Sequence, residues 1–125
     1  MILIIGGVGQ GKLDYVKQRW ELGEEDVSEA LGEQRVVYKL EAVIRGLQNE
    51  GKDPVSVVLA HAKAHPDTIY ICDEVGCGVV PVERWERAWR EAVGRCCTAL
   101  AAEAELVERV FCGLPMVLKG EQGEN

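Results

Sequence analysis

The stretch that decides the fold is Gly6-Gly7-Val8-Gly9-Gln10-Gly11-Lys12-Leu13. It follows the apolar run Ile2–Ile5, typical of a strand buried on both faces, and it leads into a segment from Lys12 to about Leu22 with helical apolar spacing. This order matches G-x-x-x-x-G-K, the pattern of a phosphate-binding loop. Glycines let successive N–H groups point at an anion, the helix start adds partial positive charge, and Lys12 would reach the β- and γ-phosphates.

The last position of the loop departs from the pattern. Phosphate-binding loops end in Ser or Thr, whose hydroxyl ligates Mg²⁺, whereas Leu13 offers no ligand. Mg²⁺ must then be held by other groups, or held weakly. The alternative to phosphate binding is a glycine-rich strand-to-helix turn in which Lys12 is simply solvated.

A second acidic element follows another apolar strand. Ile69-Tyr70-Ile71-Cys72 leads directly into Asp73 and Glu74, which has the form of a Walker B element. At the carboxyl end of a parallel strand, Asp73 could coordinate Mg²⁺ directly or through water. Glu74 could orient a nucleophile or cap the next turn. The alternative is that both are solvated carboxylates at a strand end.

The remaining chain alternates predicted strands and helices. We expect strands at 36–38, 68–72, 106–112 and 116–118, helices at 40–50, 54–65 and 82–105, a turn at 113–115, and a short helix or loop at 23–32. Asp53 and Pro54 are a good N-cap and first residue for the second of these helices. The fold class is therefore α/β, a single P-loop NTPase-like domain at 1–119 with a mostly parallel sheet flanked by helices, and a polar tail at 120–125.

Composition excludes several classes of protein. The chain has 125 residues and a net charge of −7, so it is a poor candidate for gripping a nucleic-acid backbone. The sequence has no run of about 18 apolar residues, so we expect no membrane-spanning helix. The five cysteines include no CxxC pair, so we expect reduced thiols in the cytoplasm, with Cys72 and Cys112 in the core and Cys77 in an exposed loop.

Two further pairs of residues have helical spacing. His61 and His65 are four residues apart, which can bind a metal, but no third ligand lies nearby in the sequence, so we interpret them as ordinary surface imidazoles. Trp85 and Trp89 lie on the apolar stripe of the long predicted helix. They are interpreted as packing residues or as a contact in a homo-oligomer.

A longer signature continues from the second acidic strand. It reads Asp73-Glu74-Val75-Gly76-Cys77-Gly78-Val79-Val80-Pro81 and resembles N-E-V-G-x-G-x-V-P of the adenosylcobinamide kinase / adenosylcobinamide-phosphate guanylyltransferase family. Three further segments are similar to motifs of that family: Arg90–Arg95 to F-R-D-x-x-G-R, Leu100–Ala104 to L-A-A-x-A, and Gly113–Lys119 to S-G-L-P-x-x-L-K. The phosphate loop resembles the family's G-G-x-x-S-G-K-S.

This resemblance implies an enzyme of cobalamin biosynthesis. It would bind ATP or GTP at residues 6–13 and transfer a phosphoryl group to the hydroxyl of a corrinoid, adenosylcobinamide. Lys12 would stabilise the transferring group, and Asp73 or Glu74 would help Mg²⁺.

The family's guanylyl-accepting motif, R-I-x-x-H-R-x-x-R, has no match here, so we expect a shortened, divergent member that has lost guanylyl transfer. Its acidic D-C-L-T strand is only faintly similar to Tyr38-Lys39-Leu40-Glu41, with Tyr38 at the acidic position. Three functions stay open: a kinase of this type, a non-catalytic nucleotide-binding protein with a regulatory or assembly role, and a structural subunit that assembles through the helix of Trp85 and Trp89.

Overall fold

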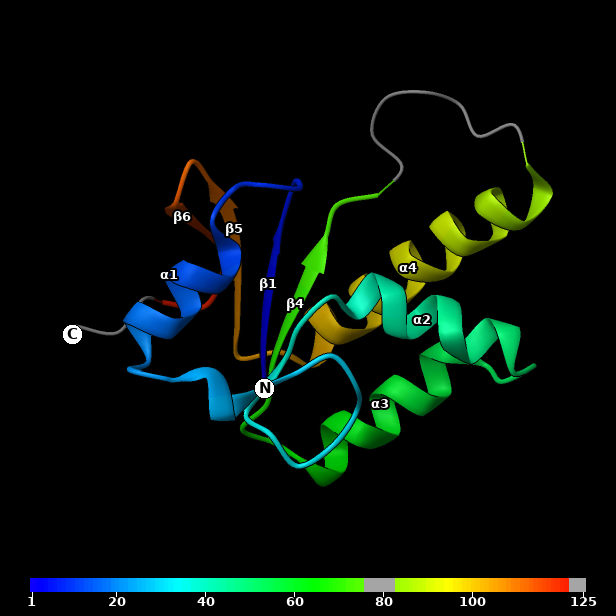
Figure 1. Cartoon of the computed structure of the whole chain (residues 1–125), viewed down its shortest axis with the longest axis horizontal. Helices are drawn as coiled ribbons and strands as arrows, with labels where there is room; N and C mark the ends of the chain where they lie inside the picture. Colours follow the sequence, from blue (N-terminus) through cyan, green and yellow to red (C-terminus); the bar gives the residue numbers. More distant parts are fainter. Residues whose placement is uncertain (76–82, 122–125) are drawn as a thin grey trace.

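A computed structural model describes residues 1–75 and 83–121 of the chain. Within these residues, one sheet of six strands has the order β2-β3-β4-β1-β5-β6 (Figure 1). The strands are β1 (Ile2–Gly6), β2 (Val27–Ser28), β3 (Val36–Val37), β4 (Ile69–Asp73), β5 (Leu106–Phe111) and β6 (Leu114–Lys119). The helices are α1 (Lys12–Arg19), the 3-10 turn η1 (Glu24–Asp26), α2 (Leu40–Asn49), α3 (Pro54–Ala64) and α4 (Arg84–Glu103).

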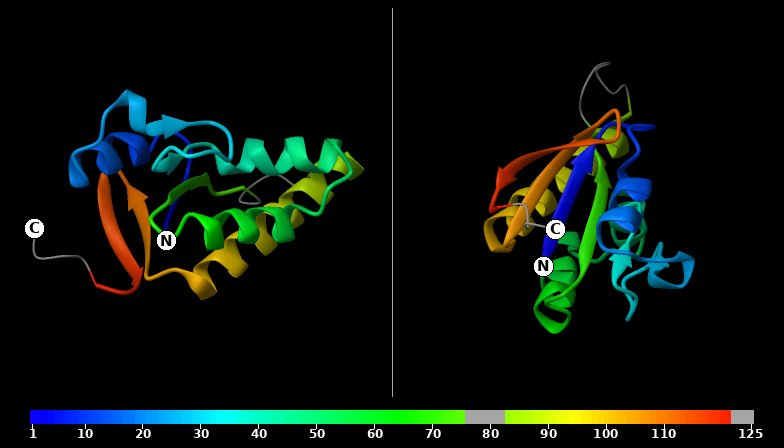
Figure 2. Two further views of the ribbon diagram at one scale, coloured as in Figure 1. Left: turned by 90° about the horizontal axis from the view of Figure 1, so that it is seen from below. Right: turned by 90° about the vertical axis from the view of Figure 1, so that its left-hand side faces the viewer.

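All neighbouring strands are parallel except β5 and β6, which form an antiparallel hairpin at one edge of the sheet (Figure 2). The predicted α/β fold is therefore confirmed. The predicted turn at 113–115 is wrong, because Leu114 and Pro115 already belong to β6. The turn is Cys112–Gly113, where both residues have positive φ, as a tight two-residue hairpin turn requires. Proline is tolerated at 115 because β6 is an edge strand.

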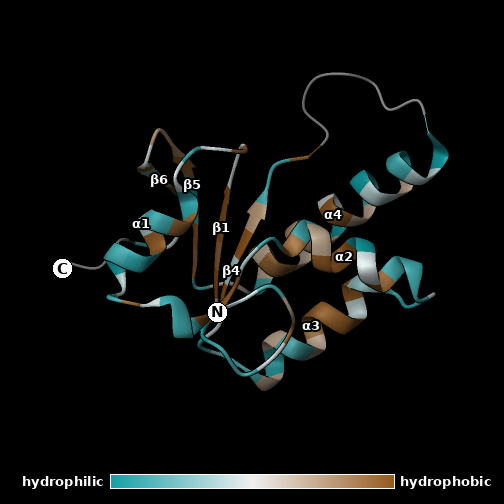
Figure 3. Ribbon diagram, viewed as in Figure 1, coloured by the Kyte–Doolittle hydropathy of each residue, from teal (hydrophilic) through white to brown (hydrophobic). Residues whose placement is uncertain are grey.

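The central strands β1 and β4 are mostly hydrophobic along their length (Figure 3). Because successive side chains of a strand point to opposite sides, they supply apolar residues to both faces of the sheet. Leu3, Tyr70 and Val107 pack in one buried cluster with α2, α3 and α4. Ile4 and Ile71 pack in the other with Val16 of α1. Figure 1 shows α1 on one side of the strands and the other three helices on the opposite side, so the molecule has three layers with the sheet in the middle.

The observed helix boundaries lie close to the predicted ones, but one helix end and one helix cap differ from the prediction. The helix predicted to run to Leu22 ends at Arg19, and Asp53 stands at the N-cap of α3 without a capping side-chain hydrogen bond. The apolar stripe of α4 does not include Trp85, which is 48% exposed. Its ring stacks instead against the Arg45 guanidinium of α2, 4.2 Å from the ring centroid. No helix in the described part of the chain is long and apolar enough to cross a membrane.

The cysteines divide between core and surface. Cys72 and Cys96 are buried, as expected for Cys72, and all four described cysteines are free thiols. The prediction that Cys112 lies in the core is wrong, because it occupies the exposed hairpin turn rather than the strand. Cys77 lies outside the described residues.

Candidate functional site

The carboxyl ends of β1 and β4 lie side by side, because Gly6 pairs with Asp73 in parallel register. The loop that follows Gly6 ends at Gly11, the N-cap of α1, whose φ of 84° lies in the left-handed region that favours glycine. Gly6 is needed for a different reason. A Cβ there would lie 2.5 Å from the carbonyl oxygen of Val110, too close for any other residue without a backbone shift.

The Lys12 side chain lies under this loop and is only 4% exposed. Its Nζ donates to the carbonyl oxygen of Gly7 at 2.7 Å and lies 2.6 Å from Oδ1 of Asp73. Lys12 is therefore not a solvated lysine. It connects the phosphate loop to the acidic end of β4, although Lys12 and Asp73 lie far apart in the sequence.

The β5–β6 hairpin supports the loop from the side. The N–H of Gly113 donates to the carbonyl oxygen of Gln10 at 2.7 Å, and the N–H of Cys112 donates to Oε1 of Gln10 at 2.8 Å. The Cα of Gly113 would lie 3.4 Å from a Cβ at Gly11. The hairpin turn and the loop therefore hold each other's backbone in place, a contact that no local sequence signal indicates.

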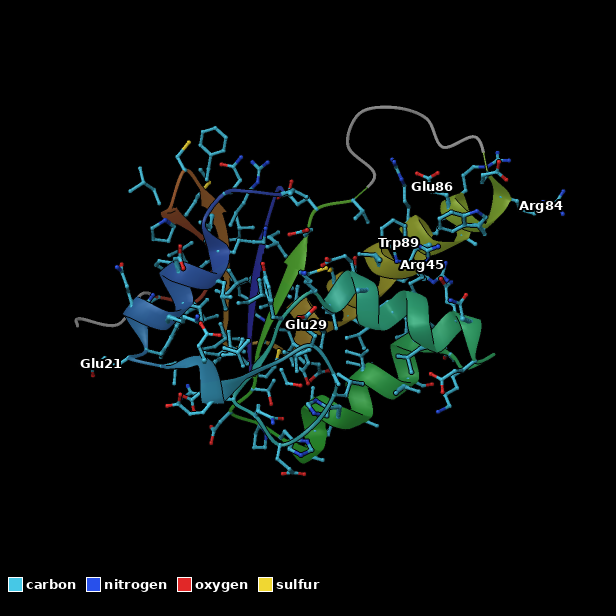
Figure 4. The ribbon with its side chains drawn as sticks, viewed as in Figure 1. Glu21, Glu29, Arg45, Arg84, Glu86 and Trp89 are labelled. Carbon is cyan, nitrogen blue, oxygen red and sulfur yellow. The ribbon has the colours of Figure 1, made fainter. Side chains whose placement is uncertain are left out.

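Asp73 has a second carboxylate beside it that sequence reasoning missed. Oε1 of Glu41, in the first turn of α2, accepts the backbone N–H of Asp73 at 2.9 Å, and Glu41 is 8% exposed. The carbonyl oxygen of Glu41 in turn accepts the indole N–H of Trp89 at 2.8 Å, on the side of α4 that faces α2 (Figure 4). Trp89 is thus a packing residue that anchors α2. The only signal for Glu41 was its place in the faint D-C-L-T similarity.

Glu74 reaches across the end of β1 to β5. Its N–H donates to the carbonyl oxygen of Gly6 at 2.8 Å, and its two carboxylate oxygens accept Nε and Nη2 of Arg109 at 2.6 and 3.1 Å. A two-pronged pair of this kind fixes the carboxylate plane as well as its position. Arg109 was not a candidate from the sequence, since it stands inside β5 next to Glu108 and outside every motif that the sequence suggests. The catalytic role of Glu74 stays a prediction.

A cavity of about 290 Å³ opens at the carboxyl ends of β1 and β4. One wall is the loop and first turn, residues 8–14, and the other is formed by Tyr38, Lys39 and Asp73. The predicted loop residues 8–13 and Asp73 therefore lie together around one space, while Gly6, Gly7 and Glu74 are not part of its lining. Backbone N–H groups and a lysine around such a space are suited to hold the phosphates of a nucleotide.

The oxygen ligands that a phosphate-bound Mg²⁺ needs are poorly represented here. Leu13 has no oxygen, Asp73 is paired with Lys12, and Glu41 accepts the Asp73 N–H, which leaves Asp14 as the other carboxylate that lines the cavity. Among the described residues no group of three His, Cys, Asp or Glu side chains could hold a metal ion. The side chains therefore do not fit a metal held by the protein itself, and the assignment of Asp73 to Mg²⁺ stays a prediction.

Two thiols lie behind Asp73. The hydrogen bond between the Cys72 and Cys97 thiols raises the pKa of Cys72, and burial raises it further. The same hydrogen bond lowers the pKa of Cys97. Cys72 therefore stays protonated and acts as a packing residue below the site.

The two histidines lie away from the loop, and His65 lies near the amino end of β4, where it lines a cavity with Thr68. His61 Nδ1 and Nε2 lie 2.6 Å from the hydroxyl of Tyr70 and 2.8 Å from the carbonyl oxygen of Gly32. The two imidazoles stack with centroids 4.2 Å apart, and His65 Nε2 lies 3.2 Å from Glu33. They are thus more constrained than the ordinary surface imidazoles we predicted. A cavity of about 530 Å³ there is larger than the one at the loop, but His65 lines it beside several carboxylates, which would repel a phosphate.

Comparison with known protein families matches residues 17–118 to the cobinamide kinase / cobinamide phosphate guanyltransferase family. The chain belongs to this family. The resemblance noted in the sequence is thereby confirmed. The match begins after the phosphate loop, so the assignment of the loop depends on the residues and geometry described above. No curated protein sequence matches the chain.

Two of the cobinamide kinase motifs meet in space. Lys119, at the end of β6, donates from Nζ to the carbonyl oxygens of Ala101 and Ala102 at 2.9 Å each. A cation at the last carbonyls of a helix satisfies acceptors that have no partner within the helix, so this contact ends α4. Of the signature that runs from Asp73 to Pro81, residues 76–81 lie outside the described residues.

Proposed function

We propose that this chain is a nucleotide-binding member of the cobinamide kinase family that holds ATP or GTP by its phosphates at residues 6–13. The observation that carries the proposal is the position of Lys12, buried under the loop with its ammonium at the base of the cavity. There it would exchange the Gly7 carbonyl for phosphate oxygens at little cost. The N–H groups of Gly9, Gly11 and Lys12 supply the remaining donors.

The reaction that family membership implies is phosphoryl transfer to a corrinoid hydroxyl, with adenosylcobinamide as substrate. The hydroxyl oxygen forms a bond to the γ-phosphorus, the bond to the bridging oxygen breaks, and the nucleoside diphosphate leaves. In this proposal Glu74, whose carboxylate is held by Arg109, orients the attacking hydroxyl. Lys12 neutralises charge that develops on the transferred group.

Guanylyl transfer is absent from this proposal. Its acceptor in the family is a histidine, and the chain has two histidines, both away from the loop. A cytoplasmic setting is part of this proposal, since the four described cysteines are free thiols.

A calorimetric titration with ATP and GTP tests nucleotide binding. Lys12→Ala should weaken binding by about 1.5–3 kcal/mol, the range for a hydrogen bond to a charged group, while Lys52→Ala, an exposed lysine, should not. Equal affinity in wild type and Lys12→Ala would remove the central claim.

A second candidate function is nucleotide binding without catalysis, favoured by Leu13 in place of the hydroxyl residue. Labelled γ-phosphate transfer to adenosylcobinamide separates the two candidates. Turnover by the wild type supports the kinase, whereas turnover that appears only in Leu13→Ser identifies a binder.

A further inference from the structure

The wall of the cavity that faces the phosphate loop carries an unassigned positive charge. Lys39 and Tyr38 line the cavity together with Asp73 and with residues 8–14 of the loop and first turn. Lys39 stands between β3 and α2, as the N-cap residue of the helix. In the faint similarity to D-C-L-T, Tyr38 stands at the acidic position and Lys39 at the next one, so a neutral residue and a cation follow each other here.

The backbone fixes Lys39 in this place. Its φ of 58° and ψ of 52° lie in the left-handed region, which a residue with a Cβ rarely adopts. The N–H groups of Ala42 and Val43 both donate to its carbonyl oxygen, at 2.9 and 3.3 Å. Backbone strain of this kind persists where the surroundings determine the conformation, and it often lies at ligand sites.

The side chain of Lys39, by contrast, is held loosely. Its Nζ lies 3.6 Å from Oε1 of Glu29 and 5.5 Å from the centroid of the Tyr38 ring. The lysine side chain is 47% exposed and that of Glu29 is 63% exposed. Glu29 lies close to the start of α2 (Figure 4). Exposed ion pairs contribute little stability, so a phosphate can displace Glu29 readily.

The two lysines at the cavity differ in how far they are neutralised. Lys12 lies 2.6 Å from the carboxylate of Asp73, while among the described residues Lys39 pairs with the exposed Glu29 at 3.6 Å. Leu13 also lines this cavity, at the loop position where Ser or Thr would supply a hydroxyl ligand for Mg²⁺. A triphosphate in this cavity therefore has a poor protein site for its usual divalent cation and a movable ammonium facing it.

We propose that Lys39 takes the charge-neutralising place of the divalent cation, so that the site binds nucleoside triphosphates without Mg²⁺. An ammonium with three donors can contact two phosphate oxygens at once as a point charge. The inference rests on the proposed function, because it names the recognition of the phosphates at that same cavity.

The test is titration of ATP in EDTA and, separately, with excess Mg²⁺. Wild type should bind in EDTA with a Kd within about threefold of its value with Mg²⁺. Lys39→Gln should raise the Kd in EDTA by about tenfold or more, the loss expected for one hydrogen bond to a charged group. Lys52→Gln is the matched control, since Lys52 is exposed and pairs with Glu50.

Lys39→Gly separates charge from folding. Glycine adopts the left-handed backbone without strain, so this variant should fold at least as stably as wild type and still lose affinity in EDTA. Thermal unfolding of each variant checks this.

The outcomes are distinguishable. If wild type does not bind ATP under either condition, the proposed function fails and this inference fails with it. If wild type binds and Lys12→Ala does not, but Lys39→Gln behaves like Lys52→Gln, the proposed function stands and the inference on Lys39 is overturned. Binding by wild type only with Mg²⁺ likewise overturns it.

Discussion

The two ends of α1 each hold a basic side chain against a carboxylate, yet the two pairs differ in their access to water. At the start of the helix, Lys12 lies 2.6 Å from Asp73, whose side chain is 24% exposed on a cavity. At its end, Nη1 of Arg19 lies 3.3 Å from Oε2 of Glu108, which is fully buried in β5. One carboxylate can exchange its partner for a ligand or water, and the other cannot.

The buried end carries a third member. The hydroxyl of Tyr15 donates to Oε1 of Glu108 at 2.6 Å and accepts Nη1 of Arg19 at 2.7 Å. These three residues do not line the cavity at the loop or the cavity at the histidines, and their contacts fix α1 on the sheet. Buried charge alone therefore does not indicate a functional site; a cavity next to the charge does.

The largest expected effect comes from Glu108→Ala. It leaves the Arg19 guanidinium and the Tyr15 hydroxyl without their carboxylate inside the core, so we expect a loss of about 3–5 kcal/mol in the free energy of unfolding, measured in urea. Glu91→Ala removes an exposed pair with Arg95 and should cost at most about 1 kcal/mol. Similar losses for the two variants would contradict the contrast between buried and exposed pairs.

Tyr15→Phe should have the next largest effect. The ring keeps its packing, but Glu108 loses a hydrogen bond to a charged oxygen, worth about 1.5–3 kcal/mol in the free energy of unfolding. The same urea titration measures it. A loss below about 0.5 kcal/mol would mean that Arg19 alone satisfies Glu108.

These two regions also differ in how far the sequence predicted them. The loop could be predicted because its donors, its glycines and Lys12 are consecutive, so local sequence determines local backbone. Asp73 followed from the rule that carboxyl ends of parallel strands meet. Both predictions needed only the order of elements along the chain.

The Glu108 cluster could not be predicted in this way. Tyr15 and Glu108 are 93 residues apart, and their contact depends on the register that pairs Ile4 with Glu108. β5 contains two adjacent charged residues, Glu108 and Arg109, and the sequence does not show which of them points into the core. Glu41 and Arg109 could not be predicted as site residues for the same reason, since each contacts the site only through the packing of elements that are distant in the sequence.

Lys12→Ala should have a small effect on stability. Asp73 is partly exposed on the cavity, so water can replace the ammonium, and we expect a change of about 1 kcal/mol in the free energy of unfolding. Affinity for nucleotide should fall in the same variant. A loss as large as that of Glu108→Ala would show that the pair is structural and would break the contrast between the two ends of α1.

The smallest effect is the part of the dependence of stability on alkaline pH that arises from Tyr15, at the buried end of α1. Burial of Tyr15, and then its hydrogen bond to Glu108, raise the pKa of the phenol above its ordinary value near 10. The folded state thus keeps this proton to higher pH than the unfolded chain, so the stabilisation is complete below about pH 10 and is lost as pH rises through the folded pKa. Burial also raises the pKa of Tyr70, which lowers stability over the same range in every variant. The difference between wild type and Tyr15→Phe isolates Tyr15: the stability advantage of wild type, measured in urea, should shrink between about pH 9.5 and 11. Parallel stability curves across that range would mean that the Tyr15 hydroxyl titrates alike in the folded and unfolded states, and that the end of α1 at Glu108 is as open to water as its start at Lys12.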